Sequence, residues 1–243
     1  MGNLDITKLG LQEVSEKSGY FMLLFGKAGV GKSSLASKLG KKVLFLDCEG
    51  TASLIEGIYR IPVTEYKEVV KYKRDFLTSD YDTLVIDGLR SFEVMVENHV
   101  CEVMGRTEYS PQQAKYGDIY TKKRLILGKF IESTIGRGKK IIIIAHVDEV
   151  EKVDTATDES FLMNEVYIKD KELKNELPAK ADIVAYLDVE VKEGKALRRF
   201  DVLPNKSKIC KNRFGITKVI TGESPKAIQG ELDKKIKEFY NKK

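Results

Sequence analysis

Short apolar runs alternate along this chain with longer segments whose apolar residues recur at helical spacing. The runs are apolar at nearly every position, which is typical of parallel strands that are covered on both faces. They occupy residues 20–25, 42–47, 83–87 and 140–145. The helical segments between them are residues 33–39, 65–77, 91–104 and 112–135. This β-α-β-α order predicts a three-layer α/β/α fold with a mostly parallel central sheet.

The pattern changes after residue 146. Residues 147–159 are acidic and rich in threonine, and they predict an exposed hairpin or loop. Residues 182–192 and 196–203 flank Glu193-Gly194-Lys195, which predicts an antiparallel hairpin near the C-terminus. Residues 224–240 predict a surface helix. We find no repeat, low-complexity tract or linker, and 243 residues suit one domain, so we expect a single domain over residues 1–243.

Composition narrows the class of protein. The chain has 42 basic and 37 acidic residues, and this net charge of +5 permits nucleic-acid binding without requiring it. Three widely spaced cysteines without a C-x-x-C pair indicate neither a disulfide framework nor a zinc site, so we expect a cytoplasmic protein. The N-terminal segment is polar, and the apolar runs are far shorter than the roughly 20 residues that cross a bilayer. We therefore expect no membrane association.

Residues 26–33 read Gly-Lys-Ala-Gly-Val-Gly-Lys-Ser, which is a complete G-x-x-x-x-G-K-S phosphate loop. It lies between an apolar run and a helical segment, which is the context that this motif requires. Its glycines permit positive φ, and its N–H groups form an anion-binding nest at a helix N-terminus. The lysine reaches the β- and γ-phosphates, and the serine hydroxyl is placed to bind Mg²⁺. We predict that ATP is bound by Gly26, Lys27, Ala28, Gly29, Val30, Gly31, Lys32, Ser33 and Ser34.

Two further apolar runs end in carboxylates. Asp87 follows Leu84-Val-Ile about 55 residues after the phosphate loop, a Walker B pattern that predicts Mg²⁺ binding opposite Ser33. Glu49 follows Phe45-Leu-Asp-Cys and is expected at the carboxyl edge of the sheet, where open α/β sheets bind ligands. A glutamate at this place can activate water for attack on the γ-phosphate. The alternative for Glu49 is a solvated carboxylate in a turn.

Two polar elements later in the chain are candidates for catalysis. His146 closes the apolar run 141–145, where it can contact the γ-phosphate or simply cap a core strand. Residues 211–215 read Lys-Asn-Arg-Phe-Gly, a K-x-R-x-G element. Lys211 and Arg213 can stabilise transition-state charge on a neighbouring subunit's nucleotide, or they can form an exposed basic loop.

With these elements in this order, residues 18–222 resemble the RecA-core branch of P-loop ATPases. The resemblance implies a RecA-like fold, with Lys32, Glu49, Asp87 and His146 as catalytic residues. It also implies a homo-oligomer in which Lys211 and Arg213 act as a finger in trans. Residues 181–187 and 212–216 look most like the phage nucleotide-binding ATPases of the Sak group, which are implicated in recombination and single-strand annealing. Single-stranded DNA and a single-strand-binding protein are then the expected partners beside ATP and ADP.

The charge pattern departs from this family at the segment that follows His146. RecA-like proteins place a DNA-contacting segment there, but here six acidic residues accompany the single Lys152, and such a segment repels phosphates. Basic residues gather instead at residues 122–124 and at Lys206, Lys208, Lys211, Arg213 and Lys218. Each group is either a site for a nucleic-acid backbone or a solvated face. Aromatic platforms for single strands are not evident from the sequence.

Three other functions are alternatives for this sequence. A small-molecule or nucleotide kinase would need an arginine-rich lid, and no compact lid pattern follows residue 112. A GTPase would need a carboxylate where Asn205-Lys-Ser-Lys208 ends in lysine, because guanine is recognised through its N–H donors. A nucleotide-gated assembly protein, in which ATP holds subunits together without hydrolysis, fits the same motifs unless Glu49 is catalytic.

Overall fold

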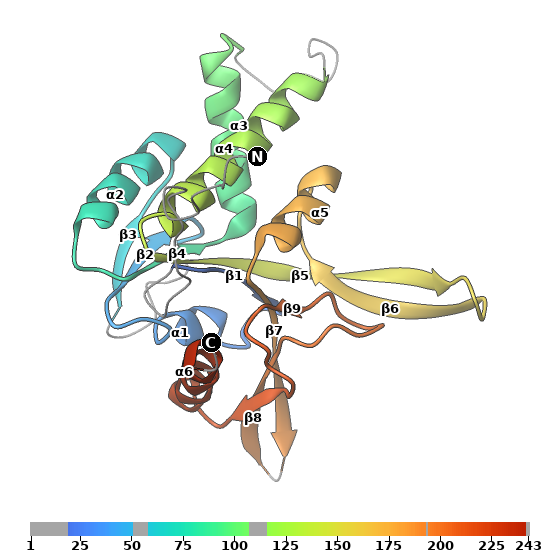
Figure 1. The fold of residues 1–243 in the computed structure, drawn as a ribbon. Helices are drawn as coiled ribbons and strands as arrows, with labels where there is room; N and C mark the ends of the chain where they lie inside the picture. Colours follow the sequence, from blue (N-terminus) through green and yellow to red (C-terminus); the bar gives the residue numbers. More distant parts are fainter. Residues whose placement is uncertain (1–18, 51–57, 107–115, 193, 242–243) are drawn as a thin grey trace, which may run out of the picture.

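The computed structural model describes residues 19–50, 58–106, 116–192 and 194–241. The predicted apolar runs are the centre of one sheet, as β1 (Phe21–Gly26), β2 (Val43–Asp47), β4 (Thr83–Asp87) and β5 (Lys140–Asp154). Two more parallel strands, β3 (Tyr59–Pro62) and β7 (Ile183–Lys192), are labelled in Figure 1. They extend this centre to the order β7-β1-β5-β4-β2-β3. All neighbours in this order are parallel. β5 therefore separates β1 from β4, and β7 lies on the other side of β1.

Antiparallel strands complete the sheet beside β7. β8 (Lys195–Asp201) pairs with β7, β10 (Ile220–Gly222) pairs with β8, and the short β9 (Lys211–Asn212) pairs with the start of β7. The predicted C-terminal hairpin is thus confirmed. β3, β9 and β10 were not predicted, because two to four residues are too few to establish a periodicity.

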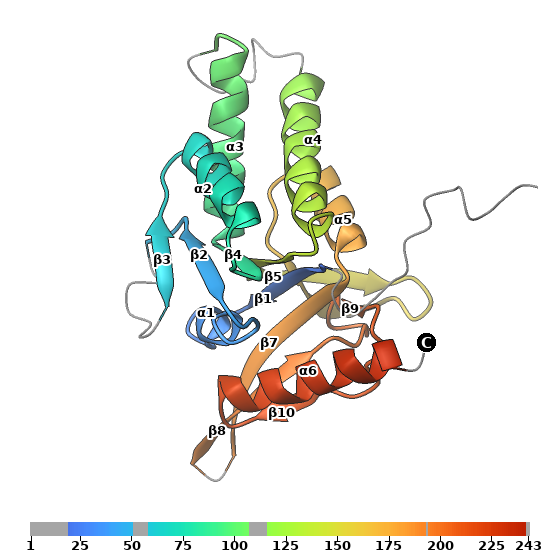
Figure 2. The same cartoon turned by 60° about the vertical axis from the view of Figure 1, so that its left-hand side comes forward.

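Helices cover both faces of the sheet, so the predicted three-layer α/β/α fold class is confirmed. Figure 2 shows α2 (Tyr66–Thr78), α3 (Leu89–Val103), α4 (Tyr116–Ile135) and α5 (Lys171–Lys180) on one side. α1 (Lys32–Ala36) and α6 (Pro225–Asn241) lie on the other. α5 was missed, because it is highly charged and contains Pro178, which usually ends a helix. The predicted start of α4 at residue 112 lies outside the described residues.

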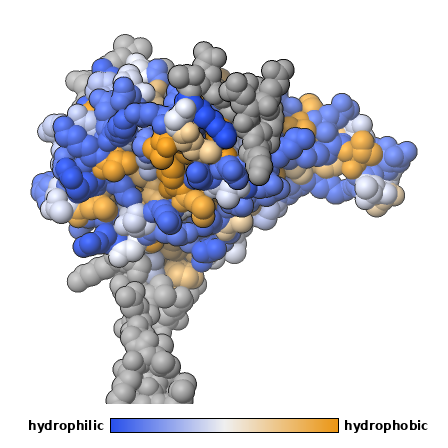
Figure 3. All heavy atoms as spheres, turned by 90° about the horizontal axis from the view of Figure 1, so that it is seen from above, coloured by the Kyte–Doolittle hydropathy of each residue, from blue (hydrophilic) through white to orange (hydrophobic). Residues whose placement is uncertain are grey.

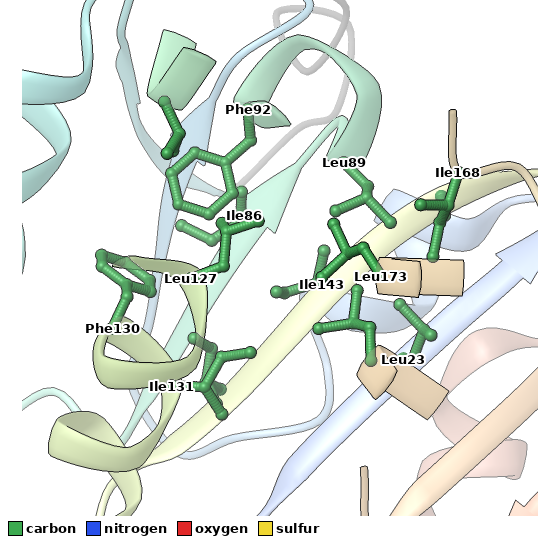
Figure 4. Close-up of a cluster of buried hydrophobic side chains, with 14 of the residues drawn as sticks. Leu23, Ile86, Leu89, Phe92, Leu127, Phe130, Ile131, Ile143, Ile168 and Leu173 are labelled. Carbon is green, nitrogen blue, oxygen red and sulfur yellow. The ribbon is translucent and has the colours of Figure 1, made fainter. Parts of the chain in front are cut away.

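The two faces of the sheet explain the continuous apolar runs. Along β1, Leu23 packs in the core beneath α3, α4 and α5, whereas Met22 and Leu24 pack in the core beneath α1 and α6. Figure 4 shows the first of these cores, where strand residues meet helix residues such as Phe92 and Leu127. A strand that is buried on both faces needs an apolar side chain at every position, so period-two alternation is lost.

β5 changes character where it leaves the sheet. Its first residues are buried on both faces, but from His146 onward exposed and half-buried residues follow one another. This outer half pairs antiparallel with β6 (Glu159–Val166), from Val147↔Val166 to Asp154↔Glu159. We call residues 147–166 the arm, and Figure 1 shows it projecting from the body of the molecule. Of the two alternatives for residues 147–159, the structure shows the hairpin, but its second strand continues to Val166, beyond the predicted range.

The surface that α3 and α4 present to solvent has both apolar and hydrophilic side chains. Figure 3 shows apolar patches among hydrophilic side chains on this side of the molecule. Val103 on α3 and Leu125 on α4 are exposed, at 70% and 56%. Among the residues that the structure describes, the helices lack the combination of length and apolar character that a bilayer crossing requires.

Candidate functional site

The phosphate loop connects β1 to α1 in the conformation that its glycines allow. Gly29 and Gly31 have φ of 79° and 89°, and Gly31 caps the first turn of α1. Gly26 is required for another reason, because a Cβ there would lie 2.2 Å from the backbone oxygen of Leu187 on β7. The loop can therefore turn its N–H groups toward an anion while β7 packs closely against its start.

The side chain of Lys32 contacts the backbone of the phosphate loop. Its side chain is buried, and Nζ donates to the backbone oxygens of Gly26 at 3.0 Å and Lys27 at 2.8 Å. Desolvation lowers the pKa of Lys32, while Asp87 and Glu49 oppose that shift. The ammonium group is thereby held beside the N–H groups of the loop, where a phosphate would lie.

Asp87 provides the test of whether the site suits a divalent cation. It is 3% exposed, and burial raises its pKa, with the charges of Glu49 and Asp47 adding to the shift and a hydrogen bond from Ser33 opposing it. Its Oδ2 atom is buried without a hydrogen-bond partner among the described residues. A carboxylate and a hydroxyl are oxygen donors of the kind that Mg²⁺ prefers. Ser33 and Asp87 therefore fit the predicted metal.

The side chains of Glu49 and His146 face each other. Glu49 Oε2 lies 3.5 Å from His146 Nε2, and both side chains are partly exposed. Gly88, with φ of 105°, follows Asp87 and caps α3. A Cβ on Gly88 would lie 2.4 Å from Cγ of Glu49, so the missing side chain makes the room that Glu49 occupies.

One pocket of about 330 Å³ joins these groups. Its lining residues are Ala28, Gly29 and residues 31–34 of the loop and α1, then Glu49, Asp87 and Gly88, and the end of β5 with His146. Two loop residues point elsewhere, because Val30 packs in the core and Lys27 pairs with Glu149 of the arm at 2.8 Å. Carboxyl ends of neighbouring parallel strands thus bring Lys32, Glu49, Asp87 and His146 together. Their catalytic roles stay predictions.

Lys211 and Arg213 are not brought to this pocket. β9 pairs with the first residues of β7, through Ile183↔Asn212, whereas the phosphate loop follows the last residue of β1. Since β7 and β1 are parallel, the K-x-R-x-G element lies at the opposite end of the sheet. Arg213 pairs there with Asp182 at 3.0 Å, and Lys211 Nζ donates to the backbone oxygen of Ala179 at 2.6 Å.

Asp47, which was not predicted as a site residue, holds the segment that carries Glu49. Asp47 is 1% exposed, and its Oδ1 accepts from the N–H groups of Glu49 at 3.3 Å and Gly50 at 2.7 Å. Arg60 on β3 binds Oδ2 at 2.8 Å. The Asp-x-Glu spacing was the available signal, but the pairing with Arg60 depends on β3 lying beside β2.

The basic groups proposed for nucleic-acid backbones need correction. Lys123 is 1% exposed and lies among Glu93, Glu97 and Asp170, so it is neither a solvated residue nor a surface contact. Lys206 and Lys208 pair with Asp154 and Asp201. Burial therefore contradicts both alternatives for Lys123, whereas Lys206 is 78% exposed, and its surface ion pair leaves both alternatives open.

A different basic surface appears where α1 and α6 approach the starts of β2 and β3. We call it the lysine–tyrosine groove, of about 560 Å³; its lysines and tyrosines are Lys38, Lys41, Lys42, Lys226, Tyr59 and Tyr81. Tyr59 is 71% exposed and meets Tyr81 edge to face at 6.4 Å. Lys42 pairs with Asp80, whereas Lys38, Lys41 and Lys226 have no ion pair within the described part of the chain. The sequence could not indicate this groove, because its residues come from separate segments.

Comparisons with known proteins place this geometry in a family. The model of the AAA domain family matches residues 18–214. Among solved structures, a KaiC-like protein from the archaeon Pyrococcus horikoshii has 14% identity and a TM-score of 0.45, over 86% of this chain and 88% of that chain. The flagellar accessory protein FlaH from Methanocaldococcus jannaschii has 12% identity and a TM-score of 0.39, over 84% of each chain. A search of curated proteins gives no match. Because the family model spans most of the chain, including the phosphate loop, Glu49, Asp87 and His146, the protein belongs to the AAA domain family.

Proposed function

We propose that the protein is a Mg²⁺-dependent ATPase. The observation that supports this most is the convergence of Glu49, Asp87 and His146 on one side of the phosphate loop, within a single pocket. A phosphate loop alone needs only Lys32 and the N–H groups to bind nucleotide. A carboxylate and an imidazole that stand beyond the γ-phosphate position are useful for hydrolysis.

In the proposed mechanism, the loop N–H groups and Lys32 hold the β- and γ-phosphates of ATP. Ser33 and Asp87 would hold Mg²⁺, which neutralises charge on these phosphates when bound. Glu49 accepts a proton from the water that attacks the γ-phosphorus, the bond from that phosphorus to the β–γ bridging oxygen breaks, and ADP leaves with the electron pair of that bond. His146 Nε2 donates to a γ-phosphate oxygen. Asp47 and Gly88 keep Glu49 in place through the contacts described above. A positioned general base of this kind contributes about 10²- to 10⁴-fold in rate.

The first test separates binding from hydrolysis. Glu49→Gln keeps the shape of the side chain but cannot accept the proton, so turnover should fall about 10²- to 10⁴-fold while ATP binding persists. Lys32→Ala removes the cation at the phosphates and should abolish binding. Turnover by production of inorganic phosphate and affinity by calorimetry measure both quantities. Wild-type turnover in Glu49→Gln would instead favour the nucleotide-gated assembly protein.

We further propose that the protein acts in DNA recombination or single-strand annealing, as the phage Sak-group ATPases do. The lysine–tyrosine groove supports this role, because three of its lysines have no ion pair among the described residues and can neutralise phosphates, and the exposed Tyr59 ring can stack on a base. The groove lies at the start of β2 and β3, away from the acidic arm. Single-stranded DNA, together with a single-strand-binding protein, is the partner that this chemistry suits.

The DNA proposal is tested by ATP turnover with and without single-stranded DNA, with Lys32→Ala as the blank. We expect stimulation, and binding that weakens as salt rises. Tyr59→Ser should weaken single-strand binding by about 1–3 kcal/mol, the typical contribution of one stacked base. Tyr167→Ser is the matched control, since Tyr167 is also an exposed tyrosine, at 41%, but lies outside the groove. If single-stranded DNA neither changes ATP turnover nor binds to the protein, this role is contradicted, and a protein partner becomes the better candidate.

A further inference from the structure

Arg198 on β8 lies against the phosphate loop, and the mechanism proposed above does not use it. A Cβ built on Gly31 would be 3.4 Å from Arg198 Nε and 4.0 Å from its Nη2. Gly31 is the residue directly before Lys32, so the guanidinium packs on the loop itself. A cation is thus placed beside the anion-binding nest from an element far away in the sequence.

Only some of the N–H groups of the Arg198 guanidinium have hydrogen-bond partners among the described residues. Nη1 donates to the backbone oxygen of Glu223 at 2.8 Å, but Nε is buried and has no partner among the described residues. The same part of the chain provides no carboxylate within ion-pair distance of Arg198. Arg199, the next residue on β8, pairs with Glu190 at 3.5 Å. Arginine does not lose its charge, so within the described residues the guanidinium is a cation beside the loop that no carboxylate neutralises, and it is available to a ligand bound there.

The order of strands shows which end of a nucleotide meets Arg198. Asp87, Glu49 and His146 come from β4, the segment after β2, and β5, and these strands lie on one side of β1. β7 and β8 lie on the other side. If the γ-phosphate faces the first group, the rest of the nucleotide extends toward β7 and β8.

The hairpin of β7 and β8 is long enough to extend past the start of the phosphate loop. β7 pairs with β1 up to Phe25↔Tyr186, and it then continues past the start of the phosphate loop. Arg198 is opposite Val189, which lies in this continuation. The hairpin therefore forms a wall next to the loop on the side where the nucleoside would lie.

We propose that Arg198 covers the base of the bound nucleotide with the plane of its guanidinium. This inference rests on the proposed ATP site and names the residue of the chain that contacts the nucleoside. The one aromatic ring among the residues that line the pocket is the imidazole of His146, which comes from β5 on the γ-phosphate side of β1. On the side of β7 and β8, the flat group beside the loop is the guanidinium of Arg198. A guanidinium is planar, stacks on aromatic faces and attracts their π electrons.

The test compares a ligand that has a base with one that has none. Affinities of ADP and of inorganic tripolyphosphate, each with Mg²⁺, are measured by calorimetry for the wild type and for Arg198→Met. Methionine keeps an unbranched stem against Gly31 and removes the planar cation. We expect ADP to bind about tenfold more weakly, as for loss of a cation–π contact, and tripolyphosphate to bind within twofold of the wild type.

Two control variants distinguish an error in the role proposed for Arg198 from an error in the proposed ATP site. Arg199→Met changes the adjacent arginine, which is paired with Glu190, and should leave both affinities unchanged. Lys32→Ala should lose both ligands; if the wild type binds neither, the ATP site itself is wrong. Unchanged tripolyphosphate binding in Arg198→Met shows that the loop is intact. The inference is overturned if ADP affinity changes less than twofold, or if both ligands weaken equally, since Arg198 would then act on phosphate alone.

Discussion

At the scale of single residues, the candidate site depends on a buried carboxylate that does not face the pocket. Asp47 accepts two N–H groups from the segment that carries Glu49 and is itself bound by Arg60. A buried charge that is paired and fully hydrogen-bonded is stable, whereas removal of one partner leaves the other uncompensated. The position of Glu49 is therefore linked to β3 through Asp47.

We predict that Asp47→Ala lowers ATP turnover through loss of the two contacts that orient Glu49. Nucleotide affinity should change little, because the contacts described for Asp47 are to Glu49, Gly50 and Arg60, which lie outside the phosphate loop. Turnover and ADP affinity are measured together. Asp82→Ala is the matched control: Asp82 accepts from the N–H groups of Lys41 at 3.2 Å and Lys42 at 2.9 Å at the other end of the sheet. Equal loss of turnover in both variants would indicate general destabilisation rather than a positioning role.

At the scale of secondary-structure elements, α2 packs against α4 through a lysine. Lys73 on α2 is 9% exposed, and its Nζ lies 4.4 Å from the centre of the Phe130 ring on α4. Nζ also donates to Ser133 of α4. Desolvation lowers the pKa of Lys73 to about 8. The contact between these helices therefore includes a buried amine whose charged form is disfavoured by desolvation.

This pKa predicts how stability changes with pH. Between pH 8 and 10.5 the unfolded chain keeps the proton on Lys73 while the folded protein loses it, so the free energy of unfolding rises with pH. The gain amounts to roughly 3 kcal/mol at most. Chemical denaturation at pH 7 to 11 should show this rise in the wild type relative to Lys73→Met. Lys71→Met, on an exposed position of the same helix, should keep the wild-type slope. A parallel pH profile for wild type and Lys73→Met would contradict the assignment.

At the scale of the whole molecule, the chemistry is divided between two ends of the sheet. The pocket lies beyond the carboxyl ends of β1, β4 and β5, whereas Lys211 and Arg213 lie beside the start of β7. Within one chain these groups cannot meet. The proposed finger role of Lys211 and Arg213 therefore requires a second copy of the chain, as in the proposed homo-oligomer.

A mixing experiment tests this arrangement. Arg213→Ala should be weakly active, and Glu49→Gln inactive, because each lacks one half of a shared site. If the finger acts in trans, mixed oligomers contain intact sites, so turnover of the mixture should exceed the sum of the two separate variants. The Arg213–Asp182 pair is exposed and contributes little stability, so loss of folding should not intervene. Normal turnover by Arg213→Ala at every protein concentration would end the proposal.

The sequence alone determined the elements and the local chemistry at their ends. The glycines of residues 26–33 set the backbone of the phosphate loop, and apolar runs that end in Asp87 and His146 predict buried strands whose carboxyl ends meet. These features depend on residues that are close in the chain. Local spacing is enough for them, because backbone sterics and double-faced burial act over a few residues.

Only the tertiary structure decided which distant residues meet. The pairing of Asp47 with Arg60, the burial of Lys123 among carboxylates, the contact of Arg198 with Gly31 and the lysine–tyrosine groove each join segments that are far apart in the sequence. In the sequence, Lys123 is one of three consecutive basic residues, and no motif indicates a role for Arg198. The physical reason is that strand order and helix packing fix these contacts, and hydrophobic periodicity reports which face of an element is buried without specifying its neighbour.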